Sequence, residues 1–443
     1  MEQSIDHKLK GESKKKKIAL KQKYKKCNEC NHKRKNFDEV HKICHLCYEA
    51  RTILVSSGNK LIDDFIKHTL INFEKRNGKM EFVPYDRFEN IELIAEEGFN
   101  KIYKAIWIDG PISKWNKKQQ KYNRLAEMVV ALKVINNSGI ITNKELNELK
   151  IFYRFAISSL NRTCVNEYYG ITYDPITQNY MIITKYCNGG NLTHYIANNF
   201  FNMNWNNKLS KLHNIIDGLH SLHMVNILHK NYHSGNIFLS NKAVIGDLSK
   251  CATANDDDDD EVYGIIPYIA PEIFQGQKYT KASDIYSFGM IMWELMTGKK
   301  PFWDQNHDIA LINKLCDGFR PPILINAPKG YIELMQECWH FDPCKRLPTF
   351  DIQSKIAIIR DYENNSITKI ISLSDNGPVI TNPGAIYKSR PLSALIKSAE
   401  SIRIKNNSGF DKRKFDNELI EDNDNNQDKK IKFIYEHENY SKN

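Results

Sequence analysis

The sequence lacks long hydrophobic runs, and it lacks an apolar segment near its N-terminus. No stretch approaches the roughly 20 apolar residues that a membrane-spanning helix needs. The opening MEQSIDHKLKGESKKKK has no apolar core of the kind found in secretory signals. These absences argue against a membrane protein and against a secreted one. We therefore expect an intracellular protein, placed in the cytoplasm.

Acidic residues are scarce in the first segment. Residues 1–26 contain ten lysines and three acidic residues, within a chain of net charge +10. Such a run of like charge repels itself and favours a solvated, mobile arm. Its charge alone could bind nucleic acid or an acidic partner, and KKKKIALKQKYKK is compatible with nuclear import. A solvated arm without a partner is the simpler alternative, and the sequence leaves these interpretations open.

The rest of the composition is that of a globular protein. The 443 residues are 41% hydrophobic and 26% charged, which suffices for one large domain or two of medium size. There are ten cysteines, and in a reducing compartment these are expected as thiols or metal ligands rather than as disulfides. Their spacing is therefore more informative than their number.

Two C-x-x-C pairs follow the basic arm, separated by thirteen residues, and they comprise Cys27, Cys30, Cys44 and Cys47. This spacing is typical of two short knuckles that close on one tetrahedral Zn²⁺, and the surrounding lysines favour the thiolate form that zinc requires. Three histidines lie close enough to compete as ligands, namely His32, His41 and His45. Four cysteines already fill a structural site, so we predict a zinc ion that scaffolds rather than catalyses.

The segments after the cysteines alternate between helical and strand patterns. Leu61, Phe65, Leu70 and Phe73 recur near helical spacing, which predicts a connecting helix. The stretch FVPYDRFENIELIAEEGFNKIYKAIWIDG predicts two strands around a turn, and MVVALKVI predicts another strand. Between these strands, PISKWNKKQQKYNRLAE is polar and basic, and we interpret it as a long exposed loop.

Eight motifs then occur in a fixed order between about residues 85 and 359. They are VALK, KELNELK, KYCNGGNL, HKNYHSGN, GDLSK, YIAPE, SDIYSFGMIMWELMTGKKPF and CWHFDPCKRLPTF. Any one of them alone could be coincidence, but in this order they resemble a eukaryotic protein kinase domain, closest to the tyrosine-kinase-like group.

The resemblance implies a fold and a division of the chain. The expected fold class is α+β, a two-lobed protein kinase fold with a small β-rich N-lobe and a larger helical C-lobe, preceded by a small zinc module. The expected segments are a basic disordered arm (1–26), the four-cysteine zinc segment (27–50), a helical linker (51–84), the kinase-like domain (85–360) and a largely disordered tail (361–443) with one short helix at 392–404.

The resemblance also assigns roles in binding ATP and Mg²⁺. Lys133 matches the lysine that holds the α and β phosphates, and Glu148 matches the glutamate that pairs with it, with Glu145 as the fallback one turn earlier. Asp247 and Asn236 match the two metal ligands. Thr184 matches the residue that controls access to the pocket behind the adenine. The other implied cofactor-binding positions are Ala95, Glu97, Asn100, Ile102, Ala131, Lys185 and Cys187.

Further positions match structural residues of the family. Asp284 is expected to brace the catalytic loop from below, and Arg346 is expected to pair with Glu272 in the interior.

The phosphate-covering loop departs from the family pattern. It usually has the sequence G-x-G-x-x-G, because only glycine lets backbone N–H groups approach phosphate oxygens without an intervening Cβ. Here Ala95, Glu97 and Asn100 occupy those positions, and Gly98 falls where the pattern leaves the residue free. The Glu97 carboxylate would repel phosphate. We therefore predict weak ATP binding.

The catalytic loop also departs from the pattern, at Asn231. His229 and Asn236 match the family's histidine and metal-binding asparagine, so Asn231 stands where an aspartate accepts the substrate's hydroxyl proton. An amide oxygen is a poor base, and a positioned base contributes about 10²–10⁴-fold to the rate. We therefore favour a pseudokinase that acts through protein partners. The alternatives are an active serine/threonine kinase with a substituted centre, and a basic zinc module that binds nucleic acid.

The activation segment carries an acidic run at Asp256–Asp260 and Glu261. In relatives a phosphate in this segment often pairs with the residue after the catalytic-loop histidine, which is Lys230 here. The run could replace such a phosphate or be a solvated acidic loop. Thr253 and Tyr263 are candidate phosphorylation sites.

Overall fold

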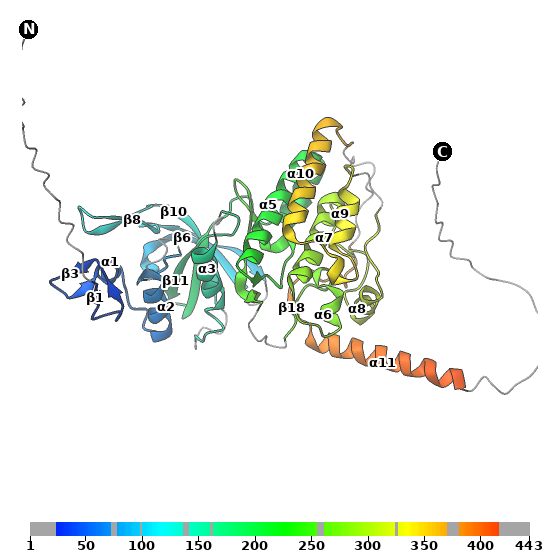
Figure 1. Cartoon of the computed structure of the whole chain (residues 1–443), viewed down its shortest axis with the longest axis horizontal. Helices are drawn as coiled ribbons and strands as arrows, with labels where there is room; N and C mark the ends of the chain where they lie inside the picture. Colours follow the sequence, from blue (N-terminus) through cyan, green and yellow to red (C-terminus); the bar gives the residue numbers. More distant parts are fainter. Residues whose placement is uncertain are drawn as a thin grey trace, which may run out of the picture.

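The computed structural model describes residues 24–71, 78–97, 100–135, 141–159, 163–254, 261–323, 327–369 and 381–415. A small cysteine-containing module, a lobe built on a β-sheet and a helical lobe follow one another along the long axis, and the helix α11 (Ser393–Phe415) extends from the helical lobe (Figure 1). The arm before Tyr24, Gly98 and the run Asp256–Asp260 lie outside the described residues.

The cysteine module consists of two short hairpins and one helix. β1 (Lys25–Lys26) pairs with β2 (Lys33–Arg34), and β3 (Phe37–Asp38) pairs with β4 (Ile43–Cys44). The helix α1 (His45–Arg51) follows directly, and α2 (Lys60–Ile71) packs against it. The connecting helix predicted from Leu61, Phe65, Leu70 and Phe73 is therefore present as α2, and Phe73 lies outside the described residues.

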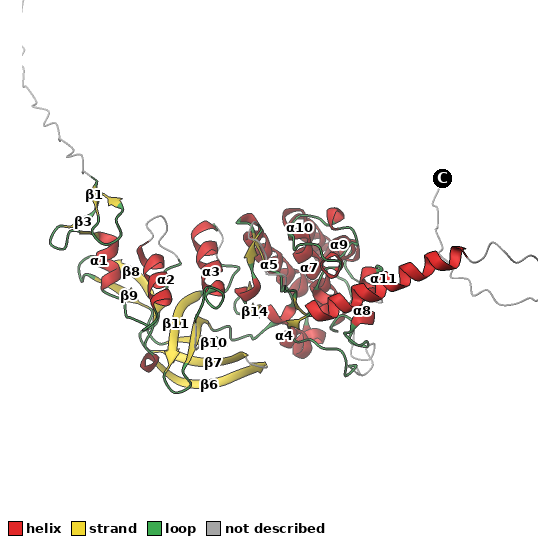
Figure 2. Cartoon of the chain, turned by 90° about the horizontal axis from the view of Figure 1, so that it is seen from below, coloured by secondary structure: helices red, strands yellow, loops and turns green. Residues whose placement is uncertain are grey.

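The N-lobe contains one six-stranded sheet in the order β5-β11-β12-β10-β7-β6, visible in yellow in Figure 2. Its strands are β5 (Glu81–Phe82), β6 (Phe88–Glu97), β7 (Asn100–Trp107), β10 (Met128–Val134), β11 (Tyr168–Asp174) and β12 (Asn179–Lys185).

Successive residues of β12 point to opposite faces of the sheet and so join different hydrophobic clusters. Ile182 joins the main core, to which the helices α2 and α3 (Asn147–Ser158) contribute, whereas Met181 and Ile183 join a smaller cluster with Trp107. This period of two is what a pleated strand with both faces covered requires.

The polar segment between β7 and β10 is a hairpin rather than the exposed loop that we predicted. β8 (Ile112–Asn116) pairs with β9 (Lys121–Arg124). The aromatic rings of Trp115 and Tyr122 lie opposite each other, with centroids 5.0 Å apart. Such cross-strand aromatic pairs stabilise a hairpin, and here they outweigh the many lysines and glutamines nearby.

The C-lobe is built around the helix α7 (Lys281–Thr297), in which every residue from Ser283 to Thr297 is buried. The other helices are α4 (Leu192–Asn199), α5 (Trp205–Met224), α6 (Pro271–Phe274), α8 (Ile309–Cys316), α9 (Tyr331–Cys338) and α10 (Thr349–Asn365). None of the helices in the described part of the chain is both long and apolar enough to cross a bilayer.

Short elements near the lobe interface carry the functional loops. They are β13 (Ile227–Leu228), η3 (Ser234–Asn236), β14 (Ile237–Leu239), β15 (Ala243–Ile245), η4 (Leu248–Lys250), β16 (Ala252–Thr253) and β17 (Tyr263–Gly264).

The described part of the tail packs on the C-lobe. The helix expected at 392–404 is longer, because α11 spans Ser393–Phe415. Residues 381–392 precede it and include the strand β18 (Arg390–Pro391). Leu392, Ile396 and Ala399 belong to the main hydrophobic core, so this part of the tail is ordered where the composition had suggested disorder.

Candidate functional site

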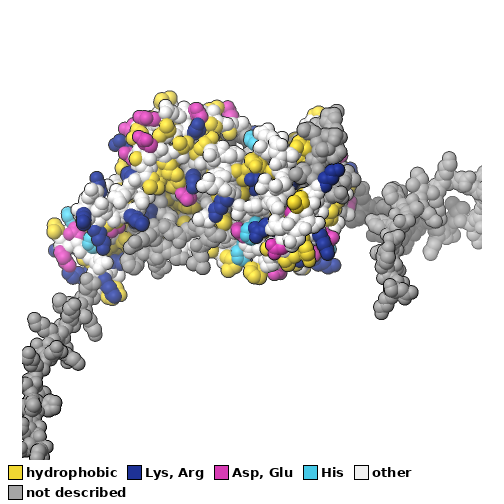
Figure 3. All heavy atoms as spheres, turned by 90° about the horizontal axis from the view of Figure 1, so that it is seen from above, with side chains coloured by type: hydrophobic (Ala, Val, Ile, Leu, Met, Phe, Trp, Pro, Cys, Tyr) yellow, Lys and Arg dark blue, Asp and Glu magenta, His cyan; other side chains and the backbone are white. Residues whose placement is uncertain are grey.

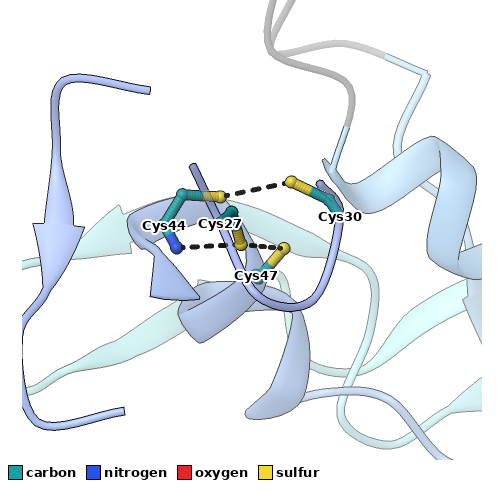
Figure 4. Close-up of side chains that lie close together, drawn as sticks. All are labelled: Cys27, Cys30, Cys44 and Cys47. Carbon is teal, nitrogen blue, oxygen red and sulfur yellow. Dashed lines mark hydrogen bonds between the residues drawn. The ribbon is translucent and has the colours of Figure 1, made fainter. Parts of the chain in front are cut away.

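The four predicted zinc ligands converge on one point. The sulfur atoms of Cys27, Cys30, Cys44 and Cys47 all lie within 4.8 Å of one another, as Figure 4 shows. The Cys27–Cys47 and Cys30–Cys44 sulfur pairs are each 3.8 Å apart. Tetrahedral zinc with Zn–S bonds of about 2.3 Å requires sulfurs separated by about 3.8 Å. The cluster therefore fits a zinc ion.

The electrostatics of the cluster also favour a cation. Burial acts against the Cys27 thiolate, but backbone N–H groups, including that of Cys44 at 3.2 Å, lower the pKa of Cys27 to about 6. Burial and the neighbouring thiols raise the pKa of Cys47. Four thiolates this close would repel one another, and a divalent cation removes that repulsion. His41 is not part of the cluster and contacts Asp38 instead.

The cysteine module is attached to the N-lobe by specific contacts. Glu29, next to the first cysteine pair, forms ion pairs of 2.9 Å with both Arg51 and Lys67. The Tyr122 hydroxyl of the β8–β9 hairpin donates to the Glu49 carboxylate at 3.0 Å. Lys33, Lys35 and Lys42 are exposed on the module, and Figure 3 shows positively charged side chains at this end of the molecule.

The catalytic loop has the geometry that its motif predicts. Asp284 is buried in α7, and its carboxylate accepts the backbone N–H groups of His229 at 2.9 Å and Lys230 at 3.0 Å. Burial raises the pKa of Asp284, but the hydrogen bond to His223 and the nearby histidine charges outweigh it and hold this pKa below its usual value. The ionised Asp284 carboxylate therefore holds the backbone of the loop in place.

Asn231 lies at the end of this braced loop and is buried. Its backbone carbonyl accepts a hydrogen bond of 2.9 Å from the Asn236 side chain, which fixes the spacing of the two residues. Its side-chain oxygen Oδ1 accepts a hydrogen bond of 3.2 Å from the Ser389 hydroxyl. The side chain at this position thus faces the Ser389 hydroxyl.

Lys133, Glu148 and Asp247 form one connected charge network. The Lys133 ammonium lies 2.9 Å from the Glu148 carboxylate and 2.5 Å from that of Asp247. Burial opposes these charges, but the two carboxylates raise the pKa of Lys133, and Lys133 in turn lowers the pKa of Asp247. Glu145 instead accepts the Thr142 backbone N–H at 2.8 Å, so Glu148 is the partner.

Two residues that the sequence did not single out support this network. The Tyr168 hydroxyl donates to Glu148 at 2.7 Å, which fixes the side of the carboxylate away from Lys133. The Asn147 side chain donates to the carbonyls of Ser249 at 3.1 Å and Cys251 at 3.0 Å. These bonds tie α3 to the segment after Asp247. No local pattern identifies either residue in advance.

The remaining predicted nucleotide positions lie on neighbouring strands of the N-lobe sheet and in the segment after β12. In the sheet, Ile102 pairs with Ala95 and Lys133, and Ala131 pairs with Thr184. The Lys185 backbone carbonyl accepts from the Asn166 side chain at 3.2 Å, and Cys187 is buried beside the same asparagine. Glu97 and Asn100 face each other at the tip of the β6–β7 hairpin. Their side chains lie outside the described residues.

The Glu272–Arg346 pair is present as predicted. The Arg346 guanidinium donates two hydrogen bonds to the Glu272 carboxylate, at 2.6 and 2.8 Å, and both side chains are buried. This bidentate pair anchors the end of the activation segment to the C-lobe.

Comparison with known proteins agrees with this geometry. The family model described as protein tyrosine and serine/threonine kinase matches residues 88–356. The chain therefore belongs to the protein kinase family, and family members in general use ATP and Mg²⁺.

The most informative relatives are much longer proteins. The chain is 31% identical to a probable serine/threonine-protein kinase of Dictyostelium discoideum over 43% of its length. It is 29% identical to a putative serine/threonine-protein kinase/receptor of Acanthamoeba polyphaga mimivirus over 43%, and 27% identical to a dual specificity protein kinase of D. discoideum over 59%. It covers only 14%, 12% and 11% of these proteins.

Proposed function

We propose that this protein is a kinase-fold signalling protein of the pseudokinase type, which binds MgATP weakly and acts through protein partners in the cytoplasm. The observation that carries the proposal is Asn231. Its position is fixed by the Asp284-braced backbone, and its side chain faces a hydroxyl group. An amide in that place cannot accept the hydroxyl proton.

The nucleotide-binding part of the proposal rests on the charge network. Lys133 would hold the phosphates, while Asp247 and Asn236 would hold Mg²⁺. Without ligand, Lys133 is already neutralised by two carboxylates, so a nucleotide must compete with Asp247 for it unless Mg²⁺ takes that carboxylate. This favours binding that depends on Mg²⁺. Ala95, Glu97 and Asn100 in place of glycines favour low affinity.

An active serine/threonine kinase is the second candidate, because the Lys133–Glu148–Asp247 network is complete. Phosphoryl transfer has a loose transition state in which positioning and metal charge dominate, so a slow rate without the base is chemically reasonable. The relatives named above do not support the third hypothesis, which is nucleic-acid binding by the basic arm. The part of the arm before Tyr24 lies outside the described residues.

We further propose that the cysteine cluster holds one structural zinc ion. The support is the tetrahedral spacing of its four sulfurs. The module that it closes is bonded to α2 and to the β8–β9 hairpin, so we assign it the role of extending the N-lobe surface that partners meet.

A nucleotide titration tests the main proposal. We expect ATP to bind with a Kd of roughly tens to hundreds of micromolar, more tightly with Mg²⁺ than without it. Lys133→Met should abolish this binding, whereas the control Lys121→Met, on the exposed β9 strand, should leave it unchanged. Affinity that is unaffected by both Mg²⁺ and Lys133→Met would contradict the proposed use of the cleft.

A further inference from the structure

Part of the tail pairs with the activation segment as an added strand. β18 pairs with β17 of the activation segment in antiparallel register, with Gly264 opposite Arg390 and Tyr263 opposite Pro391. The Leu392 backbone N–H donates to the Val262 carbonyl at 2.8 Å. Backbone pairing of this kind is how an extended peptide is recognised by a strand edge. The tail is therefore paired to β17 as an extended segment beside the catalytic loop.

Ser389 is placed against the catalytic loop by a chain of hydrogen bonds. The Gly235 backbone N–H donates to His233 Nδ1 at 3.1 Å, so the ring proton resides on Nε2. Burial lowers the pKa of His233 to about 3, so this ring is neutral. His233 Nε2 lies 3.2 Å from the Ser389 hydroxyl, which in turn lies 3.2 Å from Asn231 Oδ1. With Nε2 as the donor, the serine proton points at Asn231.

The residues before Ser389 are held by the C-lobe. The Tyr387 hydroxyl donates to the Pro301 carbonyl at 2.8 Å, and its ring packs edge-on against His307 with centroids 4.8 Å apart. The backbone N–H of His307 donates to the Gly384 carbonyl at 2.9 Å. Arg390 donates to the His307 carbonyl at 2.7 Å. Side chains on both sides of Ser389 are thus specifically contacted.

The residues after Ser389 are held by burial. Leu392 is 0% exposed, and the Val262 backbone N–H donates to the Ser393 hydroxyl at 3.2 Å. Farther along α11, Arg403 donates to the Phe274 carbonyl at 3.0 Å. Lys388 and Pro391 remain exposed, so the catalytic loop, β17 and the residues around His307 contact selected positions of the segment rather than all of them.

We propose that residues 387–392 are a built-in substrate mimic, with Ser389 in the position of the phosphate-accepting hydroxyl, and that the surface which contacts them selects extended serine peptides of the form Tyr-x-Ser-Arg-x-Leu. The inertness of Ser389 in the wild-type chain rests on the function proposed above, because Asn231 does not take its proton. While the tail is in place, protein substrates and partners that use this surface are excluded. Displacement of the tail exposes a surface for a segment of the same pattern.

An aspartate at position 231 would supply a base for phosphate transfer to Ser389. In Asn231→Asp with MgATP, the Ser389 oxygen would form a bond to the γ-phosphorus as the bond between that phosphorus and the ADP oxygen breaks. The hydroxyl proton would pass to the carboxylate introduced at position 231. The acceptor is on the same chain, so the rate per molecule should not depend on protein concentration.

The placement of the tail is tested first without nucleotide, by hydrogen exchange on the full chain. The activation-segment amides around Tyr263 should exchange at least tenfold faster in Leu392→Asp than in wild type, as should the amide at position 392 after correction for the intrinsic exchange rate of its side chain. The matched control is Ile404→Asp, because Ile404 is 68% exposed on the same helix. A labelled synthetic peptide of residues 385–396 should bind Leu392→Asp and not wild type. Equal exchange in all three proteins, or equal peptide binding, would overturn the proposal.

A second variant covers the case in which Leu392→Asp unfolds. Asn231→Asp should acquire phosphate on Ser389, detected by mass spectrometry, at a rate independent of protein concentration. Phosphate transfer to a generic protein without modification of Ser389 would overturn the tail placement. No transfer to any acceptor would instead contradict the proposed nucleotide function, and the exchange measurement would still decide the position of the tail.

Discussion

Glu294→Gln should remove a pH-dependent loss of stability that is built into the C-lobe. Glu294 lies in the central helix α7 and is 2% exposed, and one of its carboxylate oxygens, Oε2, has no hydrogen-bond partner within the described residues. Burial raises the pKa of Glu294 to about 7, although hydrogen bonds with Tyr268 and Ser234 and the charge of Lys300 act in the opposite direction. The folded protein therefore prefers the protonated acid.

The sign and size of the effect follow from linkage. An acid with a raised pKa contributes stability that is fully present below its unfolded pKa of about 4.3 and is lost as the pH rises through about 7. At about 1.4 kcal/mol per pH unit, the total loss is about 4 kcal/mol. For a domain of this size that corresponds to a shift in Tm of very roughly 6–10 °C.

Paired thermal melts measure this loss directly. Wild type and Glu294→Gln should be compared at pH 5, 6, 7 and 8, so that titrations common to both proteins cancel. The wild-type Tm should fall progressively relative to that of the variant, with most of the change between pH 5 and pH 7.5. A constant difference across the series would refute the reasoning, because it would mean that Glu294 is ionised at every pH or at none.

Two other consequences can be checked on purified protein. The chain should contain about one zinc ion per molecule by metal analysis, and Cys27→Ser or Cys44→Ser should lose this ion while the kinase domain stays folded. The control Cys344→Ser changes an exposed cysteine and should retain the zinc ion. Wild-type protein without zinc would contradict this prediction. Arg346→Met should lower the free energy of unfolding of the C-lobe by roughly 3–5 kcal/mol in urea, because it leaves Glu272 charged and buried. A decrease of less than about 1 kcal/mol would show that Glu272 finds another partner.

The motifs predicted those parts of the site that depend on short-range spacing. The positions of Lys133, Asp247 and the braced catalytic loop follow from residues close in sequence to a motif, and the structure brings them together. Likewise, two C-x-x-C pairs suffice to predict the cysteine cluster, because each knuckle is local. The helix α2 could be predicted because its apolar residues recur at helical spacing, with polar residues between them.

The features that were missed depend on contacts between distant residues. Ser389 is 158 positions from Asn231, and nothing near it in the sequence marks it as an acceptor. Within the described part of the tail the buried apolar residues are Leu392, Ile396 and Ala399, which are too few to offset its polar composition. The β8–β9 hairpin was interpreted as a loop because its one cross-strand aromatic pair, Trp115 and Tyr122, is surrounded by lysine and glutamine. Weak phosphate binding at Glu97 stays a prediction.

Phosphate transfer by Asn231→Asp tests the central claim most directly. With MgATP and an added generic protein substrate, the variant should transfer phosphate faster than wild type, counted as the total phosphate on Ser389 and on the added protein, by about 10²-fold or more if the base is the main deficiency. Asp247→Ala in each background is the control that removes the proposed metal ligand. The account predicts negligible transfer by wild type and transfer by Asn231→Asp that requires Asp247. Equal transfer by both proteins, abolished in both by Asp247→Ala, would show that this chain is a working kinase and that Asn231 does not disable it.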